Sequence, residues 1–426
     1  MENALVVADD LTGAMDTGHG FAARGRGVRV RLQSERQDAP GPATTRDVLA
    51  VDTGNRDAAP AVAAEAVTRT VETYPARRVY KKVDSTLRGN VTSEVDAAVA
   101  AAGADLAVVA PAFPATGRTT EDGRHSVEGT PLAEAGYGVD ESDLRAALAG
   151  SRYRVEHLPL ATVADGAEAV RGALAGLAGA ADRPVLVACD ATTDDHLRAI
   201  AEGAEALAGG SASSGAEANG DSEILFVGSG GLAKHVTVPG EAVPTTVQPA
   251  SRPGTLAVVG STNERTLTQL AAVSDDLVVE LDPAAAVRDP GETGRRGAVR
   301  LDRLLDRRDR AVVTAATDEG DVEAAERVAG ETGATAGERV GTALAAAAGG
   351  ATAGSRPGSL VLTGGAVARA VLARLEAPEL ALTGRAIADG VPESVVASGP
   401  ARGTRVVTKA GGFGDERTIL NCLDAL

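Results

Sequence analysis

Short apolar runs alternate with longer amphipathic stretches along the first half of the chain. The runs are rich in β-branched residues, and the stretches between them repeat apolar residues at helical spacing. The predicted strands are 4–8, 28–32, 47–51, 78–83, 105–110, 184–188 and 223–227, and the predicted helices include 60–73, 91–102, 164–178 and 194–207. Continuous apolar strands that alternate with helices favour a parallel sheet covered on both faces.

A second α/β pattern follows a proline-rich stretch. Residues 237–254 contain four prolines and have no helical period, so the domain boundary is placed there. The strands predicted after it are 255–260, 276–281, 310–315, 359–364 and 404–409. The sequence thus predicts two α/β domains with mostly parallel sheets, at 1–240 and 254–426. Residues 208–222, which are poor in apolar side chains, are expected to form a surface loop.

Length and charge narrow the class of protein. A chain of 426 residues is long enough for two domains, and no apolar run approaches the length of a membrane span. The N-terminus is acidic and lacks the basic region of a signal peptide, so a soluble cytoplasmic protein is expected. A net charge of -17 disfavours binding to nucleic acid or to anionic membranes.

The choice of cations is unusual. The chain has 42 basic residues, but its lysines are only Lys81, Lys82, Lys234 and Lys409. Excess acid and scarce lysine suggest a protein from a salt-adapted, halophilic organism, which is a hypothesis. Where arginine is the default cation, a retained lysine indicates a need for its compact ammonium group. Cys189 and Cys422 lie in apolar contexts without metal-binding spacing and are interpreted as buried thiols.

Two motifs at predicted strand ends concentrate polar groups in the first domain. Asp9 and Asp10 end the first strand, and their carboxylates can orient a hydroxyl, take its proton or hold Mg²⁺. Residues 80–90, YKKVDSTLRGN, follow another strand. There Arg88 can grip a carboxylate, Ser85 can bond a hydroxyl, and Asp84 is expected to pair with Lys82 or to accept a substrate proton.

Two further loops follow strands of the same predicted sheet. Residues 111–125, PAFPATGRTTEDGRH, form a stiff loop from which Arg118 can approach a ligand. His125 is more readily a structural hydrogen-bonding group than a general base. Residues 228–235, GSGGLAKH, are glycine-rich but have neither P-loop nor dinucleotide-binding spacing, so they indicate either ligand contact or tight packing.

Three predicted strands of the second domain end in glycine-marked turns. These turns are GSTNERT (260–266), TGGAVAR (363–369) and TKAGGFGDE (408–416). Glycine lets a phosphate chain approach the backbone, and the helix that follows supplies N–H donors. Because such ends converge in a parallel sheet, they predict a nucleotide site.

Taken in order, ADDLTGAMD, KKVDSTLRGN, PAFPATGR, VACDATTDDHL and VGSGGLA resemble the N-terminal domain of the four-carbon acid sugar kinase family. GSTNERTLTQL, LTGGAVARAVL and TKAGGFGDE resemble its C-terminal domain. The resemblance runs from about residue 4 to about residue 421. It implies an enzyme that uses ATP and Mg²⁺ to phosphorylate the terminal hydroxyl of a threonate-, erythronate- or 3-oxo-tetronate-like acid, in a cleft between the two domains.

The resemblance also assigns site residues. It implies Asp10, Ser85 and Arg88 as substrate contacts, and Ser261, Gly364, Gly365, Ala366, Val367 and Gly411 as nucleotide contacts. From their positions in the motifs, Asp9 and Arg118 are added as expected substrate contacts and Gly412 as an expected nucleotide contact. The residues expected to be catalytic are Asp10, as first choice for the base, Asp84 and Lys82, and the metal ligands are unknown. The partners expected are the sugar acid and ATP, and a homodimer is possible.

The chain departs from the family pattern in its nucleotide loops. GSTN stands where the family has Gly-Ser-Cys-Ser, GGAV where it has Gly-Gly-Glu-Thr, and AGGFG where it has Ser-Gly-Asn-Phe-Gly. These changes leave open a kinase for another small hydroxy acid or polyol, and a binding protein that has lost turnover. A nicotinamide-dependent oxidoreductase is disfavoured because the GxGxxG pattern is missing.

Overall fold

The computed structural model describes residues 1–33, 47–180, 184–209, 223–245, 247–333, 335–354 and 357–426. Most of the predicted 208–222 loop lies outside these residues. The chain divides into two compact units. The first comprises Met1–Phe21 and Gln33–Val243, and the second comprises Ala22–Leu32 and Pro244–Leu426.

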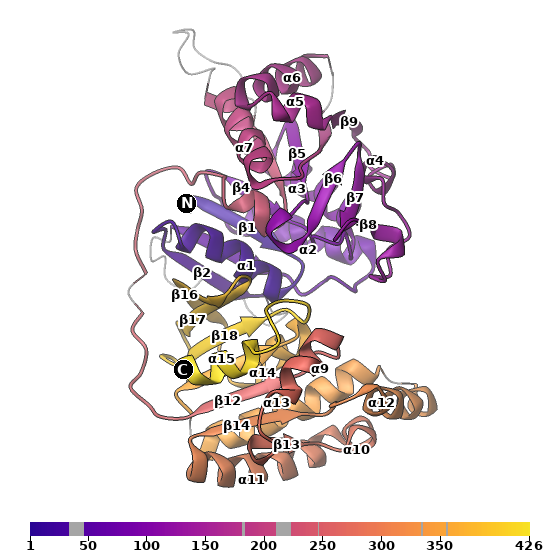
Figure 1. Cartoon of the computed structure of the whole chain (residues 1–426). Coiled ribbons are helices and arrows are strands. Elements are labelled where there is room, and N and C mark those ends of the chain that lie inside the picture. Colours follow the sequence, from indigo (N-terminus) through magenta and orange to yellow (C-terminus); the bar gives the residue numbers. More distant parts are fainter. Residues whose placement is uncertain (34–46, 181–183, 210–222, 246, 334, 355–356) are drawn as a thin grey trace. The chain divides into compact units, whose positions relative to one another are not determined.

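The first unit is built on a parallel sheet in the strand order β3-β1-β4-β11-β5-β10-β9 (Figure 1). Its strands are β1 (Ala4–Ala8), β3 (Val48–Asp52), β4 (Val79–Lys82), β5 (Leu106–Ala110), β9 (Arg154–Leu158), β10 (Val185–Cys189) and β11 (Ile224–Gly228). A small antiparallel sheet is added by β6 (Arg118–Glu121), β7 (Arg124–Val127) and β8 (Thr130–Pro131).

The helices of this unit bury apolar faces against the parallel strands. They are α1 (Leu11–Ala22), α2 (Pro60–Thr73), α3 (Val91–Ala102), α4 (Leu144–Ala147), α5 (Leu160–Ala164), α6 (Ala167–Gly179), α7 (Asp194–Gly209) and α8 (Gly230–Ala233). One core unites Val67 of α2 and Val95 of α3 with Leu5 and Val7 of β1. Alternate residues of β1, such as Val6, are equally buried but outside this core, because both faces of the sheet are covered.

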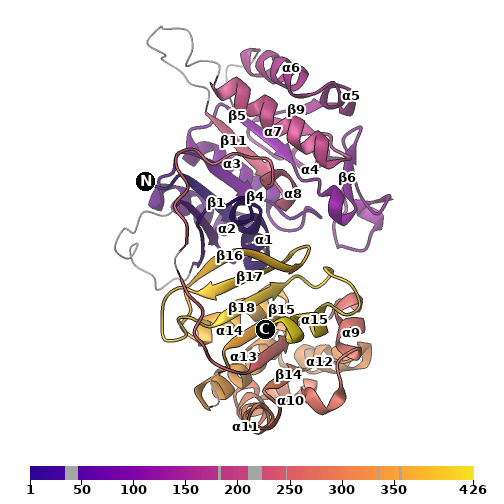
Figure 2. The same cartoon turned by 60° about the vertical axis from the view of Figure 1, so that its left-hand side comes forward.

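The second unit has a mixed sheet in the order β13-β14-β12-β15-β18-β17-β16-β2 (Figure 2). Its first five strands are parallel and its last three antiparallel. The strands are β2 (Val28–Leu32), β12 (Thr255–Val259), β13 (Val278–Glu280), β14 (Arg310–Thr314), β15 (Ser359–Thr363), β16 (Glu379–Ala388), β17 (Val391–Val396) and β18 (Arg405–Lys409).

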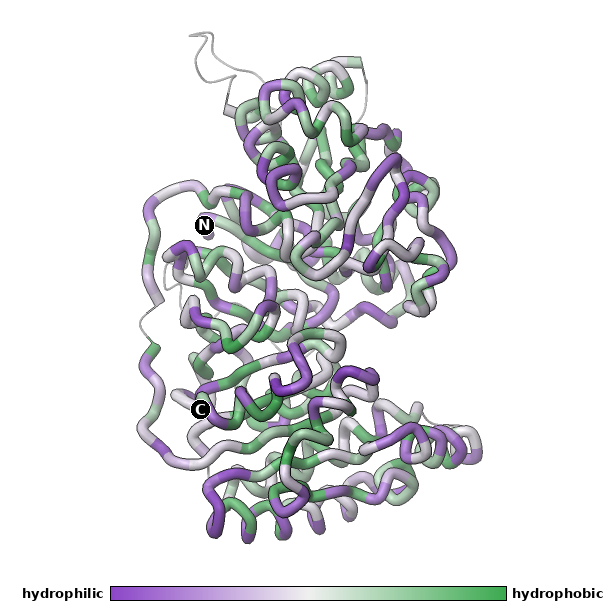
Figure 3. The backbone as a smooth tube through the Cα atoms, in the orientation of Figure 1, coloured by the Kyte–Doolittle hydropathy of each residue, from purple (hydrophilic) through white to green (hydrophobic). Residues whose placement is uncertain are grey.

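Two layers of helices cover this mixed sheet. They are α9 (Glu264–Ala271), α10 (Pro283–Arg288), α11 (Pro290–Arg308), α12 (Glu319–Thr332), α13 (Ala336–Gly354), α14 (Gly365–Arg374) and α15 (Thr418–Ala425). Leu270 of α9 and Ile419 of α15 share a core with Val259 of β12. The helices α11 and α13 pack closely, since a side chain at Gly294 would lie 2.5 Å from Ala346 Cβ. In Figure 3 the central strands are coloured as hydrophobic and much of α11 and α12 as hydrophilic.

The predicted fold class, two α/β domains with mostly parallel sheets, is confirmed. The structure differs in one assignment, because residues 28–32 lie in the first predicted domain but β2 pairs with β16 of the second unit. None of the described helices is long and apolar enough to cross a lipid bilayer.

Candidate functional site

In the first unit, polar groups gather where the strand order reverses. The strand β1 lies between β3 and β4, and the chain visits these neighbours on opposite sides. Open α/β sheets bind ligands beyond the carboxyl ends of strands at such a point. The residues that follow these three ends are Asp9 and Asp10 after β1, the 53–59 loop after β3, and Asp84 after β4.

Arg56, from the 53–59 loop, joins the carboxylates of this edge. It donates from Nε to Asp9 Oδ2 at 2.7 Å and from Nη2 to Asp9 Oδ1 at 2.8 Å. The same Nη2 donates to Asp10 Oδ1 at 2.8 Å and lies 4.0 Å from Asp84 Oδ1. Sequence reasoning missed Arg56, and its position after the strand beside β1 was the available signal.

Asp9, Asp84 and Arg56 are kept in their charged forms by neighbouring groups of opposite charge. Burial alone would raise the pKa of Asp9, but Arg56, Lys81 and Lys82 together hold it below its usual range. Burial likewise opposes ionisation of Asp84, yet Arg56 and Arg88 lower its pKa. The Arg56 pKa is raised because its attraction to the three carboxylates outweighs its burial.

The loop after β4 presents Arg88. Arg88 donates from Nε to Asp84 Oδ2 at 2.5 Å and to Thr86 Oγ1 at 3.1 Å. Its terminal nitrogens donate to no acceptor among the residues that the structure describes, so they can serve a ligand. Leu87 is held at a φ of 54°, a strained conformation of the kind found at ligand sites. Pairing with Lys82 was one of two roles expected for Asp84. The ion pairs that Asp84 forms are with Arg88 and Arg56, and Lys82 contributes only a smaller, longer-range attraction that helps to lower its pKa.

The two lysines of β4 lie beneath this edge. Lys81 is fully buried and forms an ion pair with Glu94 Oε2 at 3.3 Å. Lys82 is also buried, and its Nζ donates to Val83 O at 2.9 Å. A side chain at Gly13 would lie 2.5 Å from Asp10 Oδ1 and 3.0 Å from Lys82 Nζ, so the first turn of α1 fits closely over both groups.

Asp10 is the most accessible carboxylate of the cluster. Its side chain is 16% exposed, against 2% for Asp9. It accepts hydrogen bonds from Thr12 Oγ1 and from the Gly13 N–H, besides the bond from Arg56. These donors fix its orientation at the mouth of the site.

The β6–β7 hairpin is tied to the loop after β4 by His125. Its ring Nε2 lies 2.7 Å from Ser85 O and its Nδ1 lies 2.9 Å from Thr120 Oγ1. Burial lowers the His125 pKa, so the ring is a neutral structural link, as the sequence suggested. Arg118, at the start of this hairpin, donates to Thr116 O and to Tyr137 Oη.

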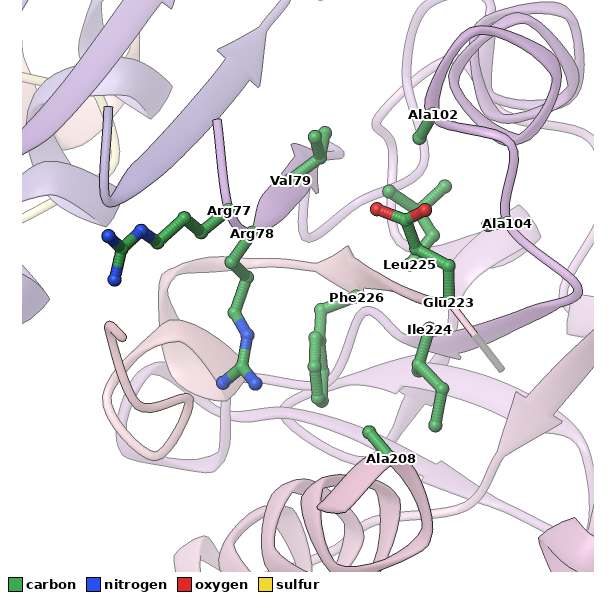
Figure 4. Close-up of a pocket in the computed structure, with 10 residues that line it drawn as sticks. All are labelled: Arg77, Arg78, Val79, Ala102, Ala104, Ala208, Glu223, Ile224, Leu225 and Phe226. Atoms are coloured by element: carbon green, nitrogen blue, oxygen red, sulfur yellow. The ribbon is translucent and has the colours of Figure 1, made fainter. Parts of the chain in front are cut away.

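A separate cavity of about 270 Å³ lies at the opposite edge of this sheet (Figure 4). Val79 and Ile224, the first residues of β4 and β11, line it. Its most prominent cation, Arg78, donates to Glu205 Oε1 and Thr237 O and stacks on Phe226. Because this cavity lies at the amino ends of the strands and its Arg78 already has partners, it is not the candidate site.

The acidic edge does not provide a magnesium cage. Among the described residues no group of three His, Cys, Asp or Glu side chains could hold a metal ion. The Arg56 guanidinium lies among Asp9, Asp10 and Asp84 and offsets part of their negative charge.

In the second unit, the three glycine-marked ends follow β12, β15 and β18, which are parallel neighbours. The predicted convergence of these ends is therefore confirmed. Gly260 donates its N–H to Thr363 O, and Gly364 donates its N–H to Lys409 O. A side chain at Gly411 would lie 2.3 Å from Ser261 Oγ, so the first and third turns touch.

The second turn opens α14 without a side-chain cap. Gly364 occupies the N-cap at a φ of 83°, which favours glycine. Backbone N–H groups in the first turn of such a helix attract anions. Val367 is buried, and a side chain at Gly260 would collide with it, so Val367 faces the protein and offers a ligand only its backbone.

The sequence places the chain among curated kinases of four-carbon acids. It is 34% identical to the D-threonate kinase of Cupriavidus necator, over 99% of this chain and 97% of that protein. It is 31% identical to the D-threonate kinase of Salmonella typhimurium, over 98% of this chain and 97% of that protein. It is also 31% identical to the 3-oxo-tetronate kinase of Methylobacterium radiotolerans, over 99% and 98%.

Solved structures share the fold over nearly the whole chain. A Salmonella typhimurium LT2 protein of 23% identity superposes with a TM-score of 0.77, over 99% of this chain and 98% of that one. A Haemophilus influenzae protein of 20% identity gives a TM-score of 0.69, over 98% of both chains.

Family models account for both units in order. A sugar-binding N-terminal domain matches residues 4–236, and a nucleotide-binding C-terminal domain matches residues 256–419. The resemblance inferred from the motifs is therefore confirmed, and the chain belongs to the two-domain family of four-carbon acid sugar kinases.

Proposed function

We propose that this chain is an ATP-dependent kinase that phosphorylates the terminal hydroxyl of a four-carbon sugar acid such as threonate. The observation that carries the proposal is the Arg56-centred cluster of Asp9, Asp10 and Asp84, with Arg88 at its rim. A small hydroxylated anion needs such a mixture of an available arginine and oriented carboxylates. The full-length relatives named as kinases support the same substrate class.

Each side chain has a proposed task. Arg88 grips the carboxylate of the acid with its terminal nitrogens, and the Ser85 hydroxyl and Arg118 bind its oxygens. Asp10 orients the attacking hydroxyl and takes its proton, because it is the most accessible carboxylate of the cluster. Asp9 and Asp84 hold Arg56 and Arg88 in place, and Asp84 is the second choice for the base.

Lys82 is proposed to act on the reaction electrostatically, from its buried position below the carboxylate cluster. Its buried ammonium, close to Gly13, adds positive potential at the position of the reacting hydroxyl. This potential favours the transferring phosphoryl group.

ATP is proposed to bind the three glycine-marked turns of the second unit through backbone groups. The donors are the amides of Gly365, Ala366 and Val367 in the first turn of α14, and those of Gly411 and Gly412, together with the Ser261 hydroxyl. Gly364, whose own N–H donates to Lys409 O, supplies the N-cap conformation that opens this turn. Because these contacts use the backbone, GGAV can serve in place of the usual Gly-Gly-Glu-Thr. Mg²⁺, when bound, neutralises charge on the triphosphate. Transfer requires the two ligands to meet in line during turnover.

A coupled assay of ADP release tests this proposal. Purified protein with ATP and Mg²⁺ is screened against D- and L-threonate, D- and L-erythronate and longer sugar acids. We expect turnover with at least one four-carbon acid, and a loss of about 10²–10⁴ in kcat for Asp10→Asn, the usual contribution of a general base. ADP binding without turnover of any acid would favour the non-catalytic alternative. The predicted homodimer and cytoplasmic location stay predictions.

A further inference from the structure

Lys409, the last residue of β18, points into the turn that follows it. Its Nζ lies 3.1 Å from Ala410 O, 3.0 Å from Gly411 O and 3.3 Å from Phe413 O. A fourth oxygen, Thr266 Oγ1, lies 3.2 Å away. The side chain is fully buried, so these oxygens replace water around the ammonium group.

The shell around this ammonium resembles that of a dehydrated monovalent cation. All four ligands are carbonyl or hydroxyl oxygens, and no carboxylate of the described residues forms an ion pair with Lys409. An ammonium has only three protons, so four contacts indicate attraction to the charge as well as directed hydrogen bonds. Arginine could not replace it, because a planar guanidinium does not fit a compact cage.

The four oxygens around Lys409 Nζ form a cage, which fixes the orientation of the peptide groups in the 410–413 turn. In a trans peptide the C=O of one residue and the N–H of the next point in opposite directions. The inward carbonyls of Ala410, Gly411 and Phe413 therefore turn the N–H groups of Gly411, Gly412 and Gly414 outward. None of these three N–H groups donates to a protein acceptor within the described part of the chain. Outward N–H groups of this kind form an anion-binding nest.

The neighbours of the turn fix its position. Thr266 Oγ1 donates to Gly411 O at 2.8 Å, and Gln269 Nε2 donates to Phe413 O at 3.1 Å. Both residues lie on α9, which follows the first glycine-marked turn. The ammonium thus draws the third turn toward the helix that belongs to the first.

We propose that Lys409 is a tethered monovalent cation, which gathers three carbonyls of the 410–413 turn so that the amides of Gly411, Gly412 and Gly414 face a phosphate of the nucleotide. Lys409 is a positioning residue that does not touch the nucleotide. The identity of the anion rests on the proposed function, whereas the cage itself does not. A protein that carries its own cation needs no added K⁺ to order this turn.

Substitution of the lysine and replacement by free cations test the proposal. ADP binding is measured by calorimetry for the wild type, Lys409→Ala and Lys409→Met, in choline, potassium or ammonium chloride at equal ionic strength. We expect equal wild-type affinity in all three salts. The ADP affinity of Lys409→Ala should fall at least tenfold in choline chloride and recover several-fold in ammonium or potassium chloride. The affinity of Lys409→Met should not recover, because the methionine side chain fills the space that a free cation would occupy.

A matched control removes a lysine from the other unit. Lys234→Met deletes the ammonium that stacks on Phe113 and is expected to keep the wild-type ADP affinity. Wild-type-like ADP binding by Lys409→Ala in choline overturns the proposal. An equal loss in all three salts overturns it as well, because a missing cation is replaceable and a missing packing group is not.

Hydrogen exchange separates this inference from the proposed function. If the wild type binds no ADP, the kinase proposal fails, but the cage still predicts slower amide exchange in the 408–417 segment of wild type than of Lys409→Ala in choline. The difference in exchange rate between the two proteins should be smaller in ammonium chloride. Equal exchange rates in choline chloride would overturn the cage. If neither variant folds, ¹⁵N spectra of the lysine ammonium groups in the wild type decide, and the lack of a slowly exchanging signal that titrates near pH 8 counts against it.

Discussion

At the residue scale, three of the four lysines are buried and donate to backbone carbonyls. Lys81 donates to Lys82 O, Lys82 to Val83 O, and Lys409 to three carbonyls of its turn. An ammonium is a compact charge that fits among peptide groups, whereas a guanidinium needs a planar space. The interpretation of these lysines as retained for their ammonium groups agrees with these contacts.

Sequence reasoning found carboxylates and arginines but not how they pair. Asp9, Asp84 and Arg88 stand beside strand ends that are visible in the sequence. Arg56 lies in an ordinary polar loop, and its importance depends on β3 lying next to β1, which no local pattern reveals. The pairing of Asp84 with arginine rather than with Lys82 likewise follows from three-dimensional proximity.

Replacing Arg56 tests the centre of the acidic cluster. Arg56→Ala leaves Asp9, Asp10 and Asp84 close together without their shared cation, so we expect kcat/KM for the sugar acid to fall at least 100-fold. Breaking a partly buried ion pair costs about 3–5 kcal/mol of unfolding free energy. Arg56→Lys keeps the charge but not the bidentate contact with Asp9, so its kcat/KM should lie between those of the wild type and Arg56→Ala. Wild-type kinetics for Arg56→Ala would remove the cluster from the account.

Acid sensitivity tests the ionised state of Asp84. Its folded pKa is lowered, so its contribution to stability is present above the unfolded value of 3.8 and is lost as pH falls through the folded pKa. Asp84→Asn lacks this titration, and its unfolding free energy should change less between pH 4 and more acidic solution. Chemical denaturation at each pH measures the slope, and identical slopes for both proteins would contradict the assignment.

The titration of Lys409 gives a second pH prediction. Burial lowers its pKa to about 8, and nearby Arg265 adds to this effect, whereas the facing Cys422 opposes it. A lowered lysine pKa means that the folded state loses its proton first, so the cage loses its charge as pH rises through about 8, well below the unfolded value of 10.5. We expect the ADP affinity of the wild type to fall as pH rises through 8, and a constant affinity to pH 9.5 would contradict this.

At the element scale, the parallel strands other than β9 were predicted within a residue or two, because strands buried on both faces form continuous apolar runs. For example, β1 and β12 begin as predicted. The strands that the sequence did not reveal are the parallel strand β9, the small sheet β6–β7–β8 and the antiparallel pair β16–β17. These strands are partly exposed or depend on distant partners, as in the pairing of β16 with β2, more than 300 residues apart.

The contact between the first and third turns of the second unit gives a prediction at this scale. Gly411→Ala places a methyl group 2.3 Å from the position of Ser261 Oγ, so one turn must shift. We expect the KM for ATP to rise about tenfold or more, with a smaller change in the KM for the sugar acid. Adding Ser261→Gly should restore part of the loss. For stability, Gly412→Ala is the matched control, because its methyl group meets no atom within 4 Å.

At the scale of the whole molecule, the chain combines a net charge of -17 with few lysines. The hypothesis of salt adaptation follows, because self-repulsion of a highly acidic surface is relieved by salt. We expect the unfolding free energy to rise from 0.1 M to 2 M KCl and the temperature midpoint to rise with it. Equal stability at both concentrations would contradict the hypothesis without affecting the kinase proposal.

The central claim is phosphoryl transfer from ATP to the terminal hydroxyl of a four-carbon acid. Phosphorus–proton correlation NMR of the product formed from threonate or erythronate tests it most directly. The account predicts a phosphomonoester signal coupled to the protons of the terminal carbon, formed in step with ADP and missing for Asp10→Asn. A phosphoryl group on another carbon, or no phosphomonoester with any four-carbon acid, would contradict it.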